Sequence, residues 1–451
     1  MRVYFRSRLL ALGVLATLVV VSVLGISPAA SAHPMPRFGS SLHQHLKQAL
    51  ENIEPVAAGP RHARARNLSL VGSLALPGFN ADVWGYKGFA YVGTWGAGDA
   101  KCPATGIRIV DLANPQQPRL IGAVAEIPKT TQEDVEVLSV STSSFRGDLL
   151  VAGIQTCGWE GPQGLDLWDV SDPYHPQHLG FWDSRGAFGV HELTVFQQGG
   201  RVYVAAATPF SDFAIGEGDF RLVDVTDPRN PVEVSEWGLS DIGAGPVCED
   251  FFVYCTFAHS VAVSKDGNTA ILSYWDFGAV FLDISNPAKP TYVRRTMYPE
   301  NADGDTHSVA LARGDNLLLT ADEDWSPVHH GDSTWGFLRI WDIKGTQQPR
   351  QISTFATTNA RTGAQDGFYS IHNPYVRGNT AYISWYSDGL RVMDISQPQT
   401  PREIASFVPP AASDPYGIWP HVPMVWGVHV DRSLILLSDI NGGLYVLKHT
   451  P

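Results

Sequence analysis

The chain has 451 residues, among them 43 glycines and 31 prolines, with 17% charged and 11% aromatic residues. This composition excludes a disordered chain, a coiled coil and a collagen-like polymer, and the length allows a large buried core. The formal net charge is −13. Because like charges repel, so acidic a chain argues against nucleic acid and anionic lipid as partners.

Residues 1–32 have the pattern of a secretory signal peptide. Three arginines within the first eight residues precede an apolar run over 9–24, and Ala30, Ser31 and Ala32 offer small residues for cleavage. We expect cleavage near Ala32, a secreted (extracellular) mature protein and no membrane span after cleavage. The alternative is an uncleaved membrane anchor, because the apolar run is near the short limit for crossing a bilayer.

Residues 33–66 are predicted to form an N-terminal helix and a linker. The segment SSLHQHLKQALENIE (40–54) begins with serine and is followed by Pro55, which is typical of a helix with defined ends. Residues 55–66 have the composition of a linker.

From residue 67 the chain repeats one unit of short apolar runs and turn residues. Its six full copies are GIRIVDLANPQQPRLIGAV, GLDLWDVSDPYHPQHLGFW, FRLVDVTDPRNPVEVSEWG, AVFLDISNPAKPTYVRRTM, FLRIWDIKGTQQPRQISTF and GLRVMDISQPQTPREIASF. The aspartates that end the third apolar run are Asp111, Asp169, Asp224, Asp283, Asp342 and Asp394. Their spacing of 52 to 59 residues is typical of propeller blades. We expect each carboxylate to accept backbone N–H groups of the following turn, which is a structural role.

Each unit divides into four predicted strands, and a seventh copy is split between the two ends of the repeat region. Residues 442–449 (GGLYVLKH) supply its third strand, and residues 68–76 (LSLVGSLAL) match the outer strand of the other copies. The sequence therefore predicts an all-β fold over residues 67–451. It is a seven-bladed β-propeller of four-stranded blades, closed by pairing of the N-terminal and C-terminal strands, which removes an open sheet edge.

The repeated turn resembles a known sequence family. An apolar run ending in Asp is followed by an aliphatic residue, Ser or Thr, Asp or Asn, and then two prolines three residues apart, as in WDVSDPYHP. This pattern is similar to the LVIVD repeat of secreted and surface bacterial proteins, over nearly all of residues 67–448. The resemblance implies the propeller fold and no particular reaction. The copy at Asp342 lacks the first proline, which leaves the geometry of that turn open.

The start of each inner strand is the strongest candidate for a site. The segments ADVWGY, EDVEVL, VHELTV, AHSVAV, THSVAL, IHNPYV and VHVDRS align Asp82, Asp134, His191, His259, His307, His372 and His429. Innermost strands line the axial channel of a propeller, so we expect these side chains to converge near one end of it. Imidazole and carboxylate are the ligands that zinc and transition metals prefer, so the pattern predicts one such ion, of undetermined identity.

The alternative for this ring is purely structural, with its polar groups bonded to one another and to channel water. Seven residues spread around a ring cannot all bind one ion. Three or four would be ligands, and the others would orient them.

Long loops on one side of the predicted propeller favour a ligand face there. They include GAGPVCEDFFVYCTFAH, NARTGAQDGFYSIH and AASDPYGIWPHVPMVWGVH, which are longer than turns require. The residues predicted for this face are Trp95, Trp275, Trp325, Trp385, Asp322 and Asp324. The expected partner is a small molecule or an extracellular protein. The alternative is that the tryptophans pack between blades and the acidic groups are solvated.

Four cysteines form an even set. Cys248 and Cys255 bracket a short loop, and Cys102 and Cys157 fall in equivalent loops of successive repeats, so we predict disulfides between the members of each pair. A metal–thiolate site is the alternative, but these cysteines lack the short paired spacing of zinc sites.

Two functions from different classes fit these observations. The first is a secreted binding protein with a loop-rich ligand face and an axial His/Asp ring that holds a metal ion. The second is a metal-dependent enzyme, an oxidoreductase or a hydrolase, that uses the same axial site. The P-loop, G-x-S-x-G and H-E-x-x-H motifs are absent from the sequence, so no reaction is indicated by motif.

Overall fold

The computed structural model describes residues 62–76, 79–96, 105–157, 161–185, 188–250, 254–299, 304–325, 334–413 and 421–450. The predicted signal peptide and the predicted helix over 40–54 lie outside these residues.

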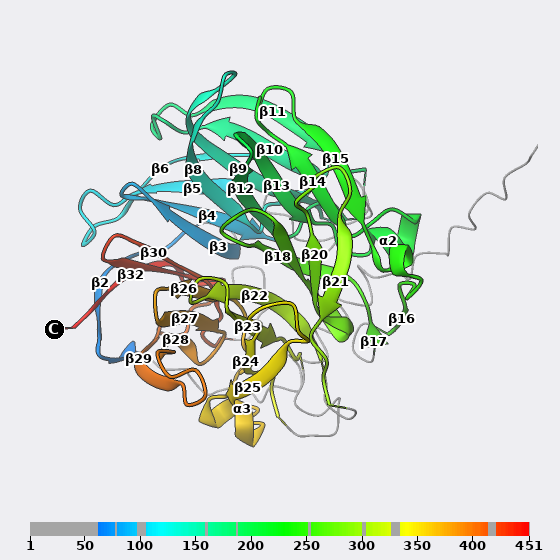
Figure 1. Ribbon diagram of the computed structural model, residues 1–451. Helices are drawn as coiled ribbons and strands as arrows, with labels where there is room; N and C mark the ends of the chain where they lie inside the picture. Colours follow the sequence, from blue (N-terminus) through cyan, green and yellow to red (C-terminus); the bar gives the residue numbers. More distant parts are fainter. Residues whose placement is uncertain are drawn as a thin grey trace, which may run out of the picture. The chain divides into compact units, whose positions relative to one another are not determined.

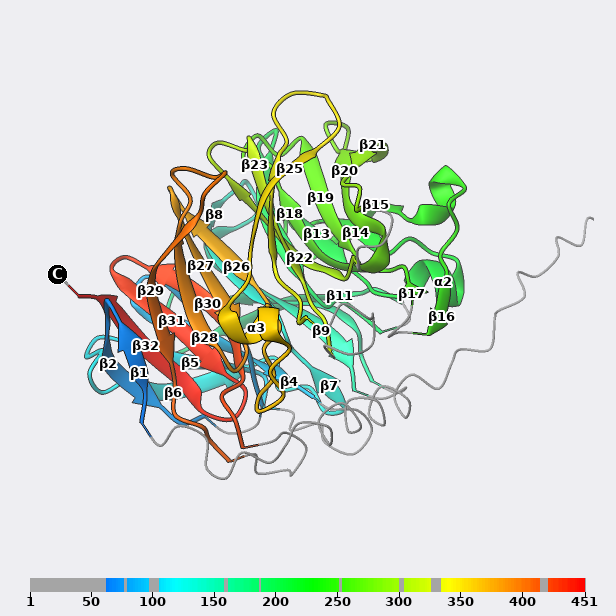
Figure 2. The same cartoon turned by 90° about the horizontal axis from the view of Figure 1, so that it is seen from below.

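Seven antiparallel sheets follow one another around a common axis in chain order (Figures 1 and 2). From inner to outer strand, blade 1 has β3 (Phe79–Tyr86), β4 (Phe89–Trp95), β5 (Ile107–Asp111) and β6 (Arg119–Val124), and blade 2 has β8 (Val135–Ser141), β9 (Arg146–Thr156), β10 (Gly164–Asp169) and β11 (Gln177–Asp183). Blade 3 has β12 (Leu193–Gln198), β13 (Arg201–Ala207), β14 (Phe220–Asp224) and β15 (Val232–Trp237), and blade 4 has β18 (Ala258–Val263), β19 (Thr269–Tyr274), β20 (Gly278–Asp283) and β21 (Thr291–Arg295).

The remaining blades continue the ring in the same order of strands. Blade 5 has β22 (Thr306–Ala312), β23 (Leu317–Asp322), β24 (Leu338–Asp342) and β25 (Arg350–Phe355), and blade 6 has β26 (Pro374–Arg377), β27 (Thr380–Trp385), β28 (Gly389–Asp394) and β29 (Arg402–Val408). Blade 7 has β30 (Val425–Asp431), β31 (Leu434–Asp439), β32 (Gly443–His449) and β2 (Leu68–Leu74). The prediction of seven four-stranded blades is confirmed.

Short elements occupy the connections between strands. They are β7 (Thr130–Thr131), β16 (Cys248–Asp250), β17 (Tyr254–Cys255), α2 (Ser211–Ile215), α3 (Thr358–Thr362), η2 (Leu239–Ile242) and η3 (Trp275–Phe277). The described part of the chain contains no helix that is both long enough and apolar enough to cross a membrane.

The ring is closed by the strand pairing that the split seventh repeat predicts. Strand β2 pairs antiparallel with β32, with Leu68 opposite His449 and Leu74 opposite Leu444. The blue strand β2 and the red strand β32 therefore lie side by side in Figure 1. The segment expected to be a linker also contains a strand, because β1 (Arg64–Arg66) pairs with β29 as a fifth strand of blade 6.

Burial along the strands explains how the blades stack. All five residues of β5 (IRIVD) are buried, whereas the outer strand β6 (RLIGAV) is mostly exposed or half-buried. A middle strand is covered on both faces by its neighbouring blades, so it is mostly apolar, and its charged residues Arg108 and Asp111 are buried as well. Apolar side chains between the blades form the hydrophobic core.

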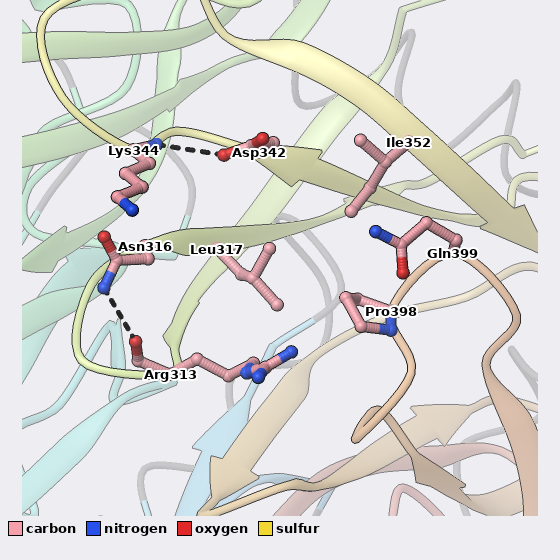
Figure 3. A pocket seen from close by; sticks show the side chains of 8 residues that line it. All are labelled: Arg313, Asn316, Leu317, Asp342, Lys344, Ile352, Pro398 and Gln399. Carbon is pink, nitrogen blue, oxygen red and sulfur yellow. Dashed lines mark hydrogen bonds between the residues drawn. The ribbon is translucent and has the colours of Figure 1, made fainter.

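The repeated aspartates have the expected structural role. In all six repeats the Asp Oδ1 atom accepts the backbone N–H two residues later, at 2.8 to 3.2 Å. The copy at Asp342 makes the same turn without its proline, since Lys344 N donates to Asp342 Oδ1 at 3.2 Å (Figure 3). The carboxylate is therefore sufficient to hold the turn, and the proline is dispensable.

Glycine at one position of the outer strands allows blade 7 to approach blade 1. A Cβ on Gly72 of β2 would lie 2.3 Å from the Pro115 carbonyl oxygen, whereas a Cβ on Gly122 of β6 would meet no atom within 4 Å. We expect Gly72→Ala to lower the free energy of unfolding by about 1–3 kcal/mol, because the clash is with backbone that cannot rotate away. Gly122→Ala is the matched control and should be nearly neutral. Urea unfolding of both variants measures this, and equal stabilities would contradict it.

Asp439 is a buried carboxyl group that joins three segments of blade 7. Its oxygens accept the backbone N–H groups of Met424, Asn441 and Gly442 at 2.7 to 3.1 Å. Burial raises the pKa of Asp439 from 3.8 to about 6, although these three hydrogen bonds lower it. The folded state therefore favours the protonated acid.

The raised pKa of Asp439 predicts a pH dependence of stability. The contribution is fully present below pH 3.8 and is lost as the pH rises through 6, a change of about 3 kcal/mol for the roughly two-unit shift. The free energy of unfolding of the wild type should therefore fall between pH 4 and pH 7 relative to that of Asp439→Asn. Chemical unfolding of both proteins at the two pH values tests this, and a constant difference would refute it.

Candidate metal centre

Each inner strand places one side chain at the axis. This side chain lies at the start of the strand, where the regular strand pairing is interrupted or has not yet begun. Register shifts interrupt β3, β18, β22 and β30 at this point. In each blade the side chain lies two residues before an equivalent pair of the inner and second strands, such as Val261 with Leu272 or Val428 with Leu437, and in blades 4 and 5 the serine between them, Ser260 or Ser308, is also paired. These positions, which we call the axial ring, hold Ala81, Glu133, His191, His259, His307, His372 and Trp426. The next residues form the second ring: Asp82, Asp134, Glu192, Ser260, Ser308, Asn373 and Gly427.

Four of the seven predicted ring residues, all histidines, occupy the axial ring. Asp82 and Asp134 lie one residue further along, in the second ring. His429 lies three residues beyond Trp426, because the match of VHVDRS to the other strand starts is out of register by three residues. Its ring packs against Trp84 at 4.2 Å and Tyr375 at 4.5 Å between centroids.

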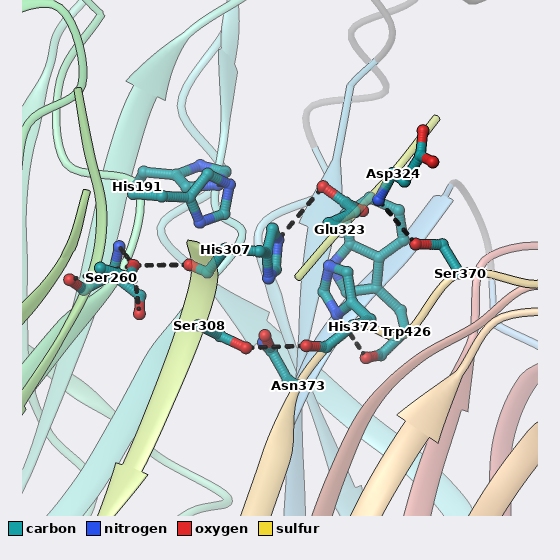
Figure 4. Close-up of polar contacts among 12 residues, drawn as sticks. His191, Ser260, His307, Ser308, Glu323, Asp324, Ser370, His372, Asn373 and Trp426 are labelled. Atoms are coloured by element: carbon teal, nitrogen blue, oxygen red, sulfur yellow. Dashed lines mark hydrogen bonds and ion pairs between the residues drawn. The ribbon is translucent and has the colours of Figure 1, made fainter. Parts of the chain in front are cut away.

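The four axial histidines follow one another from blade 3 to blade 6, and three of them, His191, His307 and His372, are labelled in Figure 4. The Nε2 atoms of His191 and His259 are 2.7 Å apart. The ring centroids of His259 and His307 are 3.9 Å apart, and those of His307 and His372 are 4.4 Å apart. Two groups have ligand atoms that all lie within 4.8 Å of one another: Glu192 with His259 and His307, and His307 with Glu323 and His372.

Carboxylates surround this cluster from three sides. Glu133 is fully buried, with Oε2 2.9 Å from His191 Nδ1 and Oε1 accepting Trp426 Nε1–H at 3.1 Å. Glu323, in the loop after β23, lies 3.5 Å from His307 Nε2 and accepts the hydroxyl hydrogen of Tyr386. The small side chain of Ala81 separates Glu133 from Trp426 in the ring, so the carboxylate can cross to the indole.

Sequence reasoning missed Glu133, Glu192 and Trp426 as members of the site. Glu133 and Glu192 are visible as neighbours of the aligned residues in EDVEVL and VHELTV. A two-residue break in pairing presents both neighbours to the channel, which a one-residue alignment cannot show. Glu323 lies between Asp322 and Asp324, two residues that were predicted for the ligand face.

Burial keeps three of the imidazoles neutral. Desolvation lowers the pKa of His259 and His307 well below 6.5, and neighbouring imidazoles lower both further. Desolvation lowers the pKa of His372 to about 3. A neutral imidazole has one free lone pair, which is the form that binds metal ions.

The nearby carboxyl groups lack a basic partner. Burial, followed by the charge of neighbouring carboxylates, raises the pKa of Asp82 and Glu192 well above normal, and burial raises that of Asp134 to about 7. Asn373 Nδ2 donates to Asp82 at 3.0 Å and to Glu192 at 3.2 Å. Among the residues that the structure describes, no Lys or Arg pairs with these three acids. Several acids thus lie at the axis without a Lys or Arg partner among the described residues.

Hydrogen bonding around the histidines fits a metal ion. His372 Nδ1 donates to the Trp426 carbonyl at 2.8 Å, which leaves the lone pair on Nε2, and Nε2 is buried without a hydrogen-bond partner. His191 Nδ1 faces acceptors only, Glu133 and Gln155 Oε1 at 2.9 Å each, so its lone pair is also on Nε2. Without an ion, His259 must then donate from Nε2, which leaves its buried Nδ1 unpaired. An ion would accept the Nε2 lone pairs of His191, His259 and His372.

The predicted ligand-face residues lie mainly inside the protein. Trp275 stacks on Phe257 beside His259, and Trp385 is fully buried with Nε1 bonded to the Tyr369 carbonyl. Of the other two tryptophans, Trp95 packs on Trp426, and Trp325 packs on Phe368 and Tyr386. Of the two acids, Asp322 pairs with Arg339 at 2.5 Å, and the backbone N–H of Asp324 donates to Ser370. Trp275 therefore forms a wall of the histidine cluster.

The cysteines agree with the predicted pairs where the structure describes them. Cys248 and Cys255 form a disulfide between β16 and β17. Cys157 is disulfide-bonded, and its predicted partner Cys102 lies outside the described residues.

Sequence comparison finds a model of the LVIVD repeat at residues 77–126, 257–297 and 374–408, which are blades 1, 4 and 6. The chain contains LVIVD repeats. The matched LVIVD segments each span a whole blade, from inner strand to outer strand. No curated protein matches this LVIVD-repeat chain in sequence.

Solved structures share the propeller fold with the LVIVD-repeat chain. Raptor of Chaetomium thermophilum is 13% identical with a TM-score of 0.53, over 87% of this chain and 30% of Raptor. The β-propeller domain of Cps50 (Swd1) of Myceliophteria thermophila is 14% identical with a TM-score of 0.50, over 85% of this chain and 100% of that domain. At such identities the likeness shows the fold alone.

Proposed function

We propose that this protein is a secreted β-propeller binding protein whose axial histidines hold one zinc or transition-metal ion. The observation that carries the proposal is His372, whose tautomer is set by the Trp426 carbonyl and whose buried Nε2 has no hydrogen-bond partner. His372 lies beside His307, and the ligand atoms of these two residues and Glu323 are within 4.8 Å of one another. A buried lone pair without a donor is costly, and a metal ion satisfies it.

The geometry needs little adjustment to bind an ion. Ligand nitrogens at about 2.0–2.1 Å from a metal lie about 2.9 Å apart at right angles and about 3.3 Å apart in a tetrahedron. The His191 and His259 Nε2 atoms, 2.7 Å apart, would move by a few tenths of an ångström. We assign His191, His259, His307 and His372 as ligands, Glu133 and Glu323 as the groups that orient them, and Glu192 as a further oxygen ligand.

Charge balance supports a cation at this place. The carboxyl groups of Glu133, Glu192, Glu323, Asp82 and Asp134 all lie at or beside the axial ring. A divalent ion would lower their cost of ionisation in a buried site. An ion held mostly by nitrogen also disfavours calcium, which prefers oxygen ligands.

Export and ligand binding belong to the same proposal. The N-terminal signal pattern and the Cys248–Cys255 disulfide support an oxidising, extracellular location. The loops on the side of the axial ring are where a small molecule or an extracellular protein would bind.

Metal content of His307→Gln and His372→Gln tests the proposed ligands. Elemental analysis of protein purified without a histidine tag should find about one ion per chain in the wild type and a strong loss in both variants, because each removes a buried ligand. His429→Gln is the matched control, since His429 is buried but lies outside the cluster, and it should keep its metal. Circular dichroism confirms folding. A metal-free wild type, or metal retained by both variants, would refute the proposal.

Glu133→Gln tests the orienting role of the carboxylate at His191. Such partners of a ligand commonly contribute about 10- to 100-fold to metal affinity, so we expect a loss of that size in competition with a chelator. Glu136→Gln is the control, because Glu136 lies on the same side of the channel but bonds to Val195 N at 2.9 Å instead of an imidazole. Equal affinities of the two variants would show that Glu133 has no such role.

A metal-dependent enzyme, an oxidoreductase or a hydrolase, is the second candidate for the same site. It is favoured by the uneven burial of the cluster, since His191 and His259 are 9% and 8% exposed whereas His307 and His372 are 1% and 0% exposed. Substrate would therefore approach from the His191 side. Azide added to cobalt-substituted protein should change the visible spectrum if a coordination position is open, and an unchanged spectrum favours the binding role.

A further inference from the structure

Four blades carry an arginine at the same position of the third strand. Arg108, Arg221, Arg339 and Arg391 each pair, through the middle strands, with the first regular residue of the inner strand. Their guanidinium groups are bonded within the protein. Arg221 contacts Glu217, Glu233 and Glu236, Arg339 contacts Asp322, Arg391 contacts Asp388, and Arg108 contacts Asn80 and Thr105.

Blade 2 has the opposite charge at this position. Asp166 pairs with Ala152, which pairs with Val135, so it is the equivalent of the four arginines. Its side chain is almost fully buried, at 3% exposure. Trp168 Nε1 donates to Oδ2 at 2.8 Å, and His178 Nε2 lies 2.8 Å from Oδ1. No Lys or Arg of the described ranges pairs with Asp166.

A pocket of about 560 Å³ opens at Asp166, between the outer parts of blades 1 and 2. Apolar side chains such as Val124 and Ile127 and the aromatic rings of Trp168 and Phe181 make up most of its wall. Glu126 is the second acidic group of the lining, and no lining residue is Lys or Arg. Glu126 also makes no ion pair with any residue that the structure describes.

We propose that this pocket binds a small organic cation, an amine or a guanidine with an apolar body. Its charge would lie against Asp166 and Glu126, and its apolar part against Trp168 and Phe181. Carboxylates give such a site its charge selectivity, and the faces of aromatic rings attract cations as well as apolar groups.

Asp166 has capacity for this ligand. An ionised carboxylate has about four acceptor positions, and two of them are taken by Trp168 and His178. His178 is the only basic residue of the lining.

Calorimetric titration of the full chain at pH 8 tests the proposal with 2-phenylethylamine and its neutral analogue 2-phenylethanol. We expect the amine to bind at least about tenfold more tightly than the alcohol, because only the amine is charged at this pH. Asp166→Asn should weaken amine binding by at least about tenfold and leave binding of the alcohol unchanged. Asp172→Asn is the matched control, since Asp172 is an exposed turn acid of the same blade that is outside the pocket lining, and it should bind like the wild type.

Asp166→Arg provides a second test, because it introduces the residue that the other blades carry. The arginine can pair with Glu126 and fill the space, so this variant should fold and should not bind the amine. Absence of amine binding to the wild type, equal binding of amine and alcohol, or full binding by Asp166→Asn would overturn the proposal. None of these results depends on metal at the axis, so the two sites are tested separately.

Discussion

The backbone hydrogen bonds between β2 and β32 hold the whole ring together. They join residues 370 to 381 positions apart and turn an open row of seven sheets into a closed one. Each inner strand then has a neighbour on both sides, so side chains at the strand starts have only the axis to face. Four imidazoles from blades 3 to 6 come within contact distance for this reason, although about 180 residues separate the first from the last.

Closure has an electrostatic consequence at the axis. Histidines and carboxyl groups that would be hydrated in the unfolded chain are brought into a small volume with little water. Neutral imidazoles and protonated acids are the forms that such a volume favours, as the pKa shifts of His372 and Asp134 show. Burying these groups lowers the free energy of unfolding, and a bound cation would raise it again in part. The pocket at Asp166 has a related feature on a smaller scale: a buried acid that pairs with His178 but with no Lys or Arg of the described residues.

Most of the architecture was predictable from the sequence because each repeat contains the residues that form its strands and turns. The aspartate that accepts the N–H two residues later recurs in six blades and marks the end of each third strand. The segment LSLVGSLAL matches an outer strand, and the last repeat is the one that lacks an outer strand. This match predicted how the ring closes. The strand at 64–66 escaped prediction, because three exposed residues, Arg-Ala-Arg, have no periodicity to recognise.

The candidate site was predictable in kind and less so in detail. Histidine at four strand starts is a pattern that the sequence shows directly. The register of the strand starts is harder to read from the sequence. A break in pairing places two successive residues toward the channel, so the first polar residue of a strand does not fix the alignment. The sequence alignment assigned His429 to the ring because it is a histidine. The pairing of β30 with β31 shows that Trp426 occupies this ring position instead.

The sequence by itself determined the fold class, the number of blades, the way the ring closes and the four histidines, because all of these follow from a local pattern repeated seven times. Only the tertiary structure decided which carboxylates accompany the histidines, which nitrogen of each ring faces the cluster, and where a repeat-breaking aspartate meets an open pocket. Those features depend on contacts between blades, which join residues that are far apart in the sequence and belong to different repeats.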